Sequence, residues 1–113
     1  MALYLARFGY TPEAWAALIK DPQDREEAAR PAFEAAGCEL KNIWYAFGEH
    51  DGYALFEAPD SVSAASIAVA VAASGSFRSF ETTALITIRE MADALRKASE
   101  IPYQPPTREH ALT

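Results

Sequence analysis

Two adjacent polar residues, His50 and Asp51, are the sharpest candidates for chemistry in this sequence. A histidine titrates near neutral pH and is the usual general base, and a neighbouring carboxylate orients its ring or favours its protonated form. The pair lies in the run Gly48-Glu49-His50-Asp51-Gly52, whose Asp-Gly step is a turn signal between two β runs. Neighbouring residues in a turn need not face each other. The alternative is therefore a solvent-exposed turn in which Asp51 binds local backbone amides.

A second set of polar and amphipathic side chains lies among apolar neighbours on segments that we predict as strands. The set comprises Arg7, Trp44, Tyr45, Tyr53, Glu57 and Glu81. A mostly apolar pocket with a few convergent polar groups is the usual form of a small-molecule site. In that interpretation Arg7, paired with Glu57 or Glu81, anchors an anionic or polar ligand. In the alternative, the Arg–Glu pair is structural and bridges a dimer, while the aromatic residues pack the core.

Other kinds of site find little support in the sequence. Only His50 and His110 offer imidazole ligands, and one histidine with scattered carboxylates does not give metal-ligand spacing. The single cysteine, Cys38, is more typical of a small buried hydrophobic residue than of a nucleophile. No glycine-rich phosphate loop, Gly-x-Ser-x-Gly elbow or two-histidine helix motif occurs. We therefore expect no metal, no cofactor and no nucleotide-dependent chemistry.

The elements that position these residues follow from hydrophobic periodicity and from helix start and stop signals. The predicted order is a strand over 2–10, a helix opened by Thr11, a helix over 21–36 that Pro31 should kink, strands over 38–47 and 53–58, a helix capped by Asp60, a strand over 77–86, and a final helix opened by the capping box of Thr87 and Glu90. Gly37 and Gly75 are predicted helix stops. This β-α-β-β-α-β order predicts an α+β, ferredoxin-like fold with helices on one face of an antiparallel sheet.

The second face of that sheet is left uncovered by the predicted helices. Leucine and aromatic residues lie on it, and an exposed apolar patch of several hundred Å² is an aggregation hazard. We expect two sheets to pack together in a two-fold homodimer, a dimeric α+β barrel-type association, or in a higher homo-oligomer. The alternative is that the final helix folds back over the sheet.

Length and composition limit the remaining possibilities. The chain has 113 residues, half of them hydrophobic, and 10 Lys and Arg against 16 Asp and Glu give a formal charge of −6. We predict one domain over residues 1–100, followed by a Pro-rich tail over 101–113. The acidic balance argues against nucleic acid or an anionic membrane as partner. Without a signal segment, a membrane span or a disulfide framework, we expect a soluble, cytoplasmic protein.

The run from Gly48 to Asp51 and the segment Tyr53-Ala-Leu-Phe-Glu-Ala-Pro-Asp60 resemble the GYD domain family of small bacterial proteins. The opening Met1-Ala-Leu-Tyr4 strand, the aromatic strand around Trp44 and the start of the final helix fit the same pattern, which covers about residues 2–99. The resemblance implies a dimeric, ferredoxin-like α+β protein. The family's glycine and aspartate map onto Gly48 and Asp51, and His50 stands where the family has an aromatic residue.

Two classes of function follow from these observations. In the first, the protein binds a small apolar or aromatic molecule within a homo-oligomer. A cofactor-independent enzyme is the catalytic form of this function, and that step rests on fold analogy alone. In such an enzyme His50 is the base, Asp51 orients it, and Arg7 and Tyr45 anchor the substrate. In the second class, the protein is a non-catalytic structural or assembly module whose sheet face serves only oligomerisation.

Overall fold

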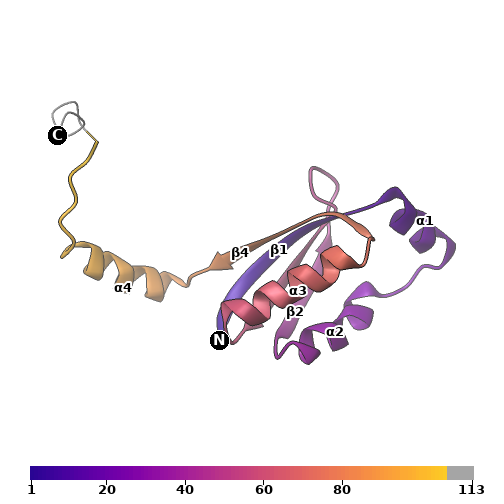
Figure 1. Ribbon diagram of the computed structural model, residues 1–113, viewed down its shortest axis with the longest axis horizontal. Coiled ribbons are helices and arrows are strands. Elements are labelled where there is room, and N and C mark those ends of the chain that lie inside the picture. The colour runs from indigo at the N-terminus through magenta and orange to yellow at the C-terminus, as the bar shows by residue number, and fades with distance from the viewer. Residues whose placement is uncertain (107–113) are drawn as a thin grey trace.

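The protein was analysed as a computed structural model in which residues 1–106 are described. In that part of the chain the elements follow the order β1 (Ala2–Tyr10), α1 (Pro12–Lys20), α2 (Arg25–Ala35), β2 (Glu39–Tyr45), β3 (Gly52–Ala58), α3 (Ser61–Ala73), β4 (Phe77–Leu85) and α4 (Ile88–Ala98). Helices α2 and α3 lie over one face of the sheet, whereas α4 lies beyond the end of β4 (Figure 1). The predicted α+β, ferredoxin-like arrangement of elements is confirmed.

The four strands form one antiparallel sheet in the order β2-β3-β1-β4. Strand β1 is central, so Arg7 lies between Tyr53 on β3 and Glu81 on β4. Because side chains alternate between the faces of a strand, these three residues share the face that the helices leave open. The same register therefore places five of the six predicted strand residues on the open face and Tyr45 on the helix-covered face.

The helix boundaries follow from capping interactions. Asp24 accepts the backbone N–H of Glu27, so the helix predicted over 21–36 begins at Arg25 and continues through Pro31. The predicted capping box is present, with Thr87 and Glu90 each accepting the other's backbone N–H. Positive φ angles of 77° at Gly37 and 78° at Gly75 agree with their predicted role as helix stops.

The hydrophobic core lies between the helix-covered face of the sheet and helices α2 and α3. Phe56 at its centre is fully buried, stacks on Tyr4 at 5.5 Å and meets Phe33 of α2 edge-on at 5.1 Å. From the other helix, Ala64 and Ile67 of α3 complete the cluster. Burial of one aromatic side chain contributes about 1.5–3 kcal/mol, so these contacts stabilise the packing of α2 and α3 on the sheet.

Helix α4 does not fold back over the sheet, contrary to the alternative considered from the sequence. It continues outward from β4 (Figure 1), and the molecule measures 62 × 30 × 23 Å. Its apolar stripe, which includes Ile88, Met91 and Leu95, is solvent-exposed. The open face of the sheet and the stripe on α4 thus both lack a covering element among residues 1–106. Residues 107–113, which include His110, lie outside the described part of the chain.

Candidate functional site

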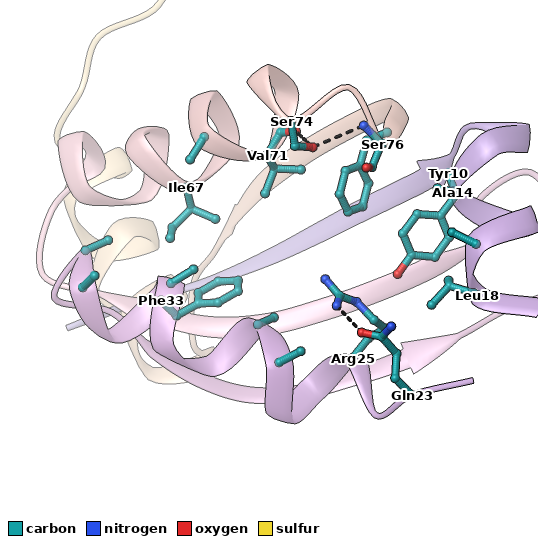
Figure 2. Close-up of a pocket in the computed structure, with 18 of the residues that line it drawn as sticks. Tyr10, Ala14, Leu18, Gln23, Arg25, Phe33, Ile67, Val71, Ser74 and Ser76 are labelled. Carbon is teal, nitrogen blue, oxygen red and sulfur yellow. Dashed lines mark hydrogen bonds between the residues drawn. The ribbon is translucent and has the colours of Figure 1, made fainter. Parts of the chain in front are cut away.

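A cavity lies between α1 and α2 on one side and α3 on the other, above the helix-covered face of the sheet (Figure 2). Its volume of about 690 Å³ falls in the usual range of small-molecule sites. The lining residues are Tyr10, Ala14, Ala17, Leu18, Gln23, Arg25, Ala28, Ala29, Ala32, Phe33, Ala35, Ala36, Ser66, Ile67, Ala70, Val71, Ser74, Ser76 and Phe77. Most of them are apolar, so the cavity is suited to an apolar molecule.

Small side chains on the helices create this space. Nearly half of the lining residues are alanines, and half of these alanines lie on α2. Protein interiors are close-packed, so a volume of this size persists only where side chains are too short to fill it. Phe33 on α2 and Ile67 on α3 line the end of the cavity that lies away from Tyr10 (Figure 2). The cavity is thus a direct product of the alanine-rich helix faces.

Arg25 and Gln23 lie at one end of the cavity near Tyr10, whereas the lining serines Ser74 and Ser76 lie on the side opposite Arg25 (Figure 2). The Tyr10 hydroxyl lies 3.4 Å from the hydroxyl of Tyr45, and Arg25 Nη1 donates to Gln23 Oε1 at 2.6 Å. Burial raises the pKa of the Tyr10 phenol strongly, the Tyr45 hydroxyl adds to the shift, and the Arg25 guanidinium opposes it. Tyr10 is therefore a neutral hydrogen-bond donor at pH 7, and Arg25 is a cation beside it.

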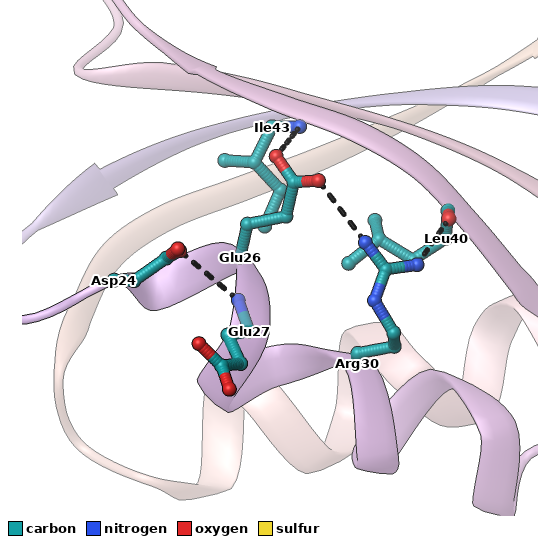
Figure 3. A network of polar contacts seen from close by, with 6 residues as sticks. All are labelled: Asp24, Glu26, Glu27, Arg30, Leu40 and Ile43. Carbon is teal, nitrogen blue, oxygen red and sulfur yellow. Dashed lines mark hydrogen bonds and ion pairs between the residues drawn. The ribbon is translucent and has the colours of Figure 1, made fainter.

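The walls of the cavity are held by polar contacts on its outer side. Glu26 and Arg30 form an ion pair at 3.0 Å on α2 (Figure 3). Arg30 donates to the carbonyl oxygen of Leu40 at 2.9 Å, and Glu26 accepts the backbone N–H of Ile43 at 3.3 Å. These contacts cross the irregularity in β2 between Leu40 and Asn42, where the regular strand pairing shifts. They fasten the first turn of α2, and with it Arg25, to the edge of the sheet.

The predicted pair His50 and Asp51 lies in the hairpin between β2 and β3. Asp51 Oδ2 accepts the backbone N–H of Tyr10 at 2.8 Å and lies 3.5 Å from Arg78 Nη2. His50 instead meets the ring of Tyr53 edge-on at 6.0 Å. No hydrogen bond joins the two side chains among the residues that the structure describes. Asp51 therefore binds a backbone amide of β1 and not the local amides of an exposed turn that the alternative expected.

The predicted strand residues separate into two groups. On the open face, Arg7 donates to Thr83 at 3.0 Å, and its Nε lies 3.7 Å from Glu81. Glu57 pairs with Lys41 at 3.8 Å rather than with Arg7. Trp44 and Tyr53 are paired across β2 and β3 on the same face. Tyr45 lies on the opposite face, next to Tyr10 and the cavity. The six residues therefore do not converge on one pocket.

Sequence reasoning missed Tyr10, Gln23 and Arg25 as candidate ligand-binding residues. A signal was present in α2, where Arg25, Ala29, Ala32 and Ala36 recur at helical spacing and place one cation at the end of an alanine stripe. That stripe reads equally well as a helix packed closely on its neighbour. Only the position of α3 in three dimensions shows that it lines a cavity.

The fold and the cavity together define a ferredoxin-like α+β protein with a mostly apolar cavity between its helices. The sequence pattern of the GYD domain matches residues 4–95, and the chain belongs to this family. No functionally curated protein matches the chain.

Among solved structures, the chain is similar to MtbAldR, with a TM-score of 0.57 and 13% identity over 76% of this chain and 53% of that one. It is also similar to FFRP-DM1, with a TM-score of 0.49 and 13% identity over 76% and 100% of the two chains. A transcriptional regulator from Neisseria meningitidis, solved as an L-Met complex, gives a TM-score of 0.49 and 10% identity over 99% and 59%. The chain thus spans about half of MtbAldR, and identities this low show likeness of fold alone.

In the described part of the chain no helix has the length and apolar character needed to cross a membrane. Within residues 1–106 no group of three or more His, Cys, Asp or Glu side chains is placed to hold a metal ion.

Proposed function

We propose that this GYD domain protein binds a small, largely apolar molecule in the cavity between α1, α2 and α3, and that it does so as a homo-oligomer. The cavity itself carries the proposal, because it combines apolar walls with a few polar groups at Tyr10 and Arg25. A space of this size left empty or filled with poorly bonded water is unfavourable. A ligand with an apolar body removes that cost by contacting the alanine side chains that line the walls.

The oligomeric part of the proposal rests on the two uncovered apolar surfaces. Leu3, Leu5 and Leu55 lie side by side on the open face of the sheet, and α4 presents its own stripe to solvent. A second copy of the chain covers these apolar side chains, which is the usual two-fold solution.

Filling the cavity tests the binding function. Ala29→Leu adds three carbon atoms to the inner face of α2, and we expect it to weaken binding of an apolar fluorescent probe such as 1-anilinonaphthalene-8-sulfonate by about tenfold or more. The measurement is a fluorescence titration. Ala16→Leu, on α1 but outside the cavity, is the matched control and should bind like the natural protein. Equal affinities in all three proteins would contradict the proposal.

The catalytic form of the proposal assigns His50 as base and Asp51 as its orienter. The contacts of Asp51 instead predict that Asp51→Ala lowers the free energy of unfolding by about 1–3 kcal/mol, because it leaves the Tyr10 amide without its acceptor. His50→Gln should change the free energy of unfolding by less than about 0.5 kcal/mol. Urea denaturation measures both. A large loss of stability in His50→Gln together with none in Asp51→Ala would reverse these roles.

The second candidate function is that of an assembly module, and the projecting helix α4 favours it. A helix with an unpaired apolar stripe beyond the body of the domain is an arrangement suited to clasping another subunit (Figure 1). In that case the protein oligomerises but binds no small molecule. Because both functions require the oligomer, the probe titration, which detects a ligand in the cavity, is the measurement that separates them.

A further inference from the structure

We infer that the cavity takes an amphiphilic monoanion, a molecule with an apolar body and a single carboxylate, which Arg25 and Tyr10 bind at its polar end. The inference rests on the proposed function, since it names the chemical class of the ligand for the same cavity. Its basis is the charge and bonding of Arg25 and Tyr10 relative to the other lining residues.

Arg25 differs from most other arginines in lacking a carboxylate partner. Within residues 1–106, Arg7, Arg30, Arg78 and Arg96 each lie within 4.0 Å of an Asp or Glu oxygen, and Arg25 and Arg89 do not. Arg89 is exposed on α4, whereas Arg25 is half-buried and lines the cavity. An anion that enters the cavity would find in Arg25 a cation that no carboxylate among residues 1–106 already pairs with.

The acidic residues near Arg25 are engaged elsewhere. Asp24 caps α2 through the backbone N–H of Glu27. Glu26 contacts Arg30 and the amide of Ile43 on the outer side of the helix (Figure 3). The guanidinium of Arg25 instead donates to the neutral Gln23 amide and lies close to the neutral Tyr10 hydroxyl. Remaining donors of the guanidinium point into the cavity near the Tyr10 hydroxyl (Figure 2), where a carboxylate oxygen would meet them.

Tyr10 provides the second donor for the same group. Its hydroxyl stays protonated, and its pairing with Tyr45 leaves it able to donate to a ligand while it accepts from the Tyr45 hydroxyl. Together with Arg25 it forms a cationic and a neutral donor at one end of the space. This arrangement matches a carboxylate, which accepts several hydrogen bonds on its two oxygens.

The other lining residues determine the net charge and the apolar character that the ligand should have. Arg25 is the single charged residue among the described lining residues, so the charge of one anion is balanced and that of a dianion is not. Away from Arg25 the walls are alanine side chains with Phe33, Ile67 and Val71 (Figure 2). These contacts suit an alkyl chain or a fused aromatic body rather than a sugar or a nucleotide.

The experiment compares matched acid and amide ligands on the full-length protein. Isothermal titration calorimetry with 2-naphthoate, 2-naphthamide, decanoate and decanamide should show each acid binding about tenfold tighter than its amide, because a charge-assisted pair is lost in the amide. Arg25→Gln should remove this difference, and Tyr10→Phe should reduce it. Arg89→Gln, which removes the other unpaired described arginine, is the control and should keep the full preference.

Each outcome decides the inference. Equal binding of acid and amide by the natural protein overturns the monoanion class while leaving the apolar cavity ligand of the proposed function intact. Failure of all four ligands to bind, together with an unaltered probe titration in Ala29→Leu, overturns the proposed function as well. An affinity for the acids that falls as the protein concentration rises would indicate that α4 of a second copy competes for the cavity. That result would overturn the inference. Should Arg25→Gln fail to fold, the acid–amide comparison in the natural protein still decides it.

Discussion

Truncating Phe56 to alanine is expected to lower the free energy of unfolding by about 3–5 kcal/mol. Phe56 is fully buried on β3, and its ring contacts Tyr4 from β1 and Phe33 from α2. Removing the ring leaves a void where sheet and helix meet, and the surroundings relax into it only partly. Because small domains are stable by about 5–15 kcal/mol, this one change removes a large share of the stability.

Thermal and urea denaturation, followed by circular dichroism, measure the effect. Phe47→Ala is the matched control, since Phe47 has the same side chain but is fully exposed in the hairpin. It should change the free energy of unfolding by less than about 0.5 kcal/mol. Similar losses in the two variants would show that the core does not lie between Phe56 and the helices.

A charge on the open face of the sheet is expected to dissociate the proposed homo-oligomer. Leu5 on β1 lies opposite Leu55 on β3 and Thr83 on β4, at the centre of that face. Leu5→Asp would bury an unpaired carboxylate between two copies, which weakens association by roughly 100-fold or more. Light scattering after size exclusion, at micromolar concentration, should show the natural protein as an oligomer and the variant as a monomer.

Val69→Asp is the control for this experiment. Val69 is 67% exposed on α3, on the side of the sheet that the helices cover, so a charge there should not alter the oligomer. A natural protein that is monomeric at this concentration, or a Leu5→Asp variant that remains an oligomer, would contradict the proposed association. The result also bears on the assembly function, which requires the oligomer but no ligand.

Local signals in the sequence predicted most of the fold. The Thr87–Glu90 capping box and the stop at Gly37 depend on a few neighbouring residues, and both are present in the structure. The strand predicted over 38–47 is shorter in the structure, where it covers Glu39–Tyr45. The pairing stops at Tyr45, because Ala46 turns to donate its backbone N–H to the carbonyl of Asp51.

The candidate site was harder to predict because it depends on packing over long sequence distances. Arg25 of α2 and Tyr10 of β1 approach each other across the cavity, and neither has a sequence neighbour that indicates a site. The direction of α4 was equally hidden, because its stripe of Ile88, Met91 and Leu95 indicates that the helix needs a partner but not which partner. Periodicity specifies a face, whereas the neighbour of that face is set by the tertiary arrangement.

The contact between Asp51 and the amide of Tyr10 joins two parts of the molecule that are 41 residues apart. It lies at the irregularity of β1 between Gly9 and Tyr10, where the pairing with β4 shifts and the strand alters its course. The hairpin is therefore bonded to the backbone of a residue that lines the cavity, and we expect a ligand in the cavity to restrict the hairpin as well as Tyr10. Amide hydrogen exchange at Tyr10 and at Asp51 should slow together when a ligand binds in the cavity.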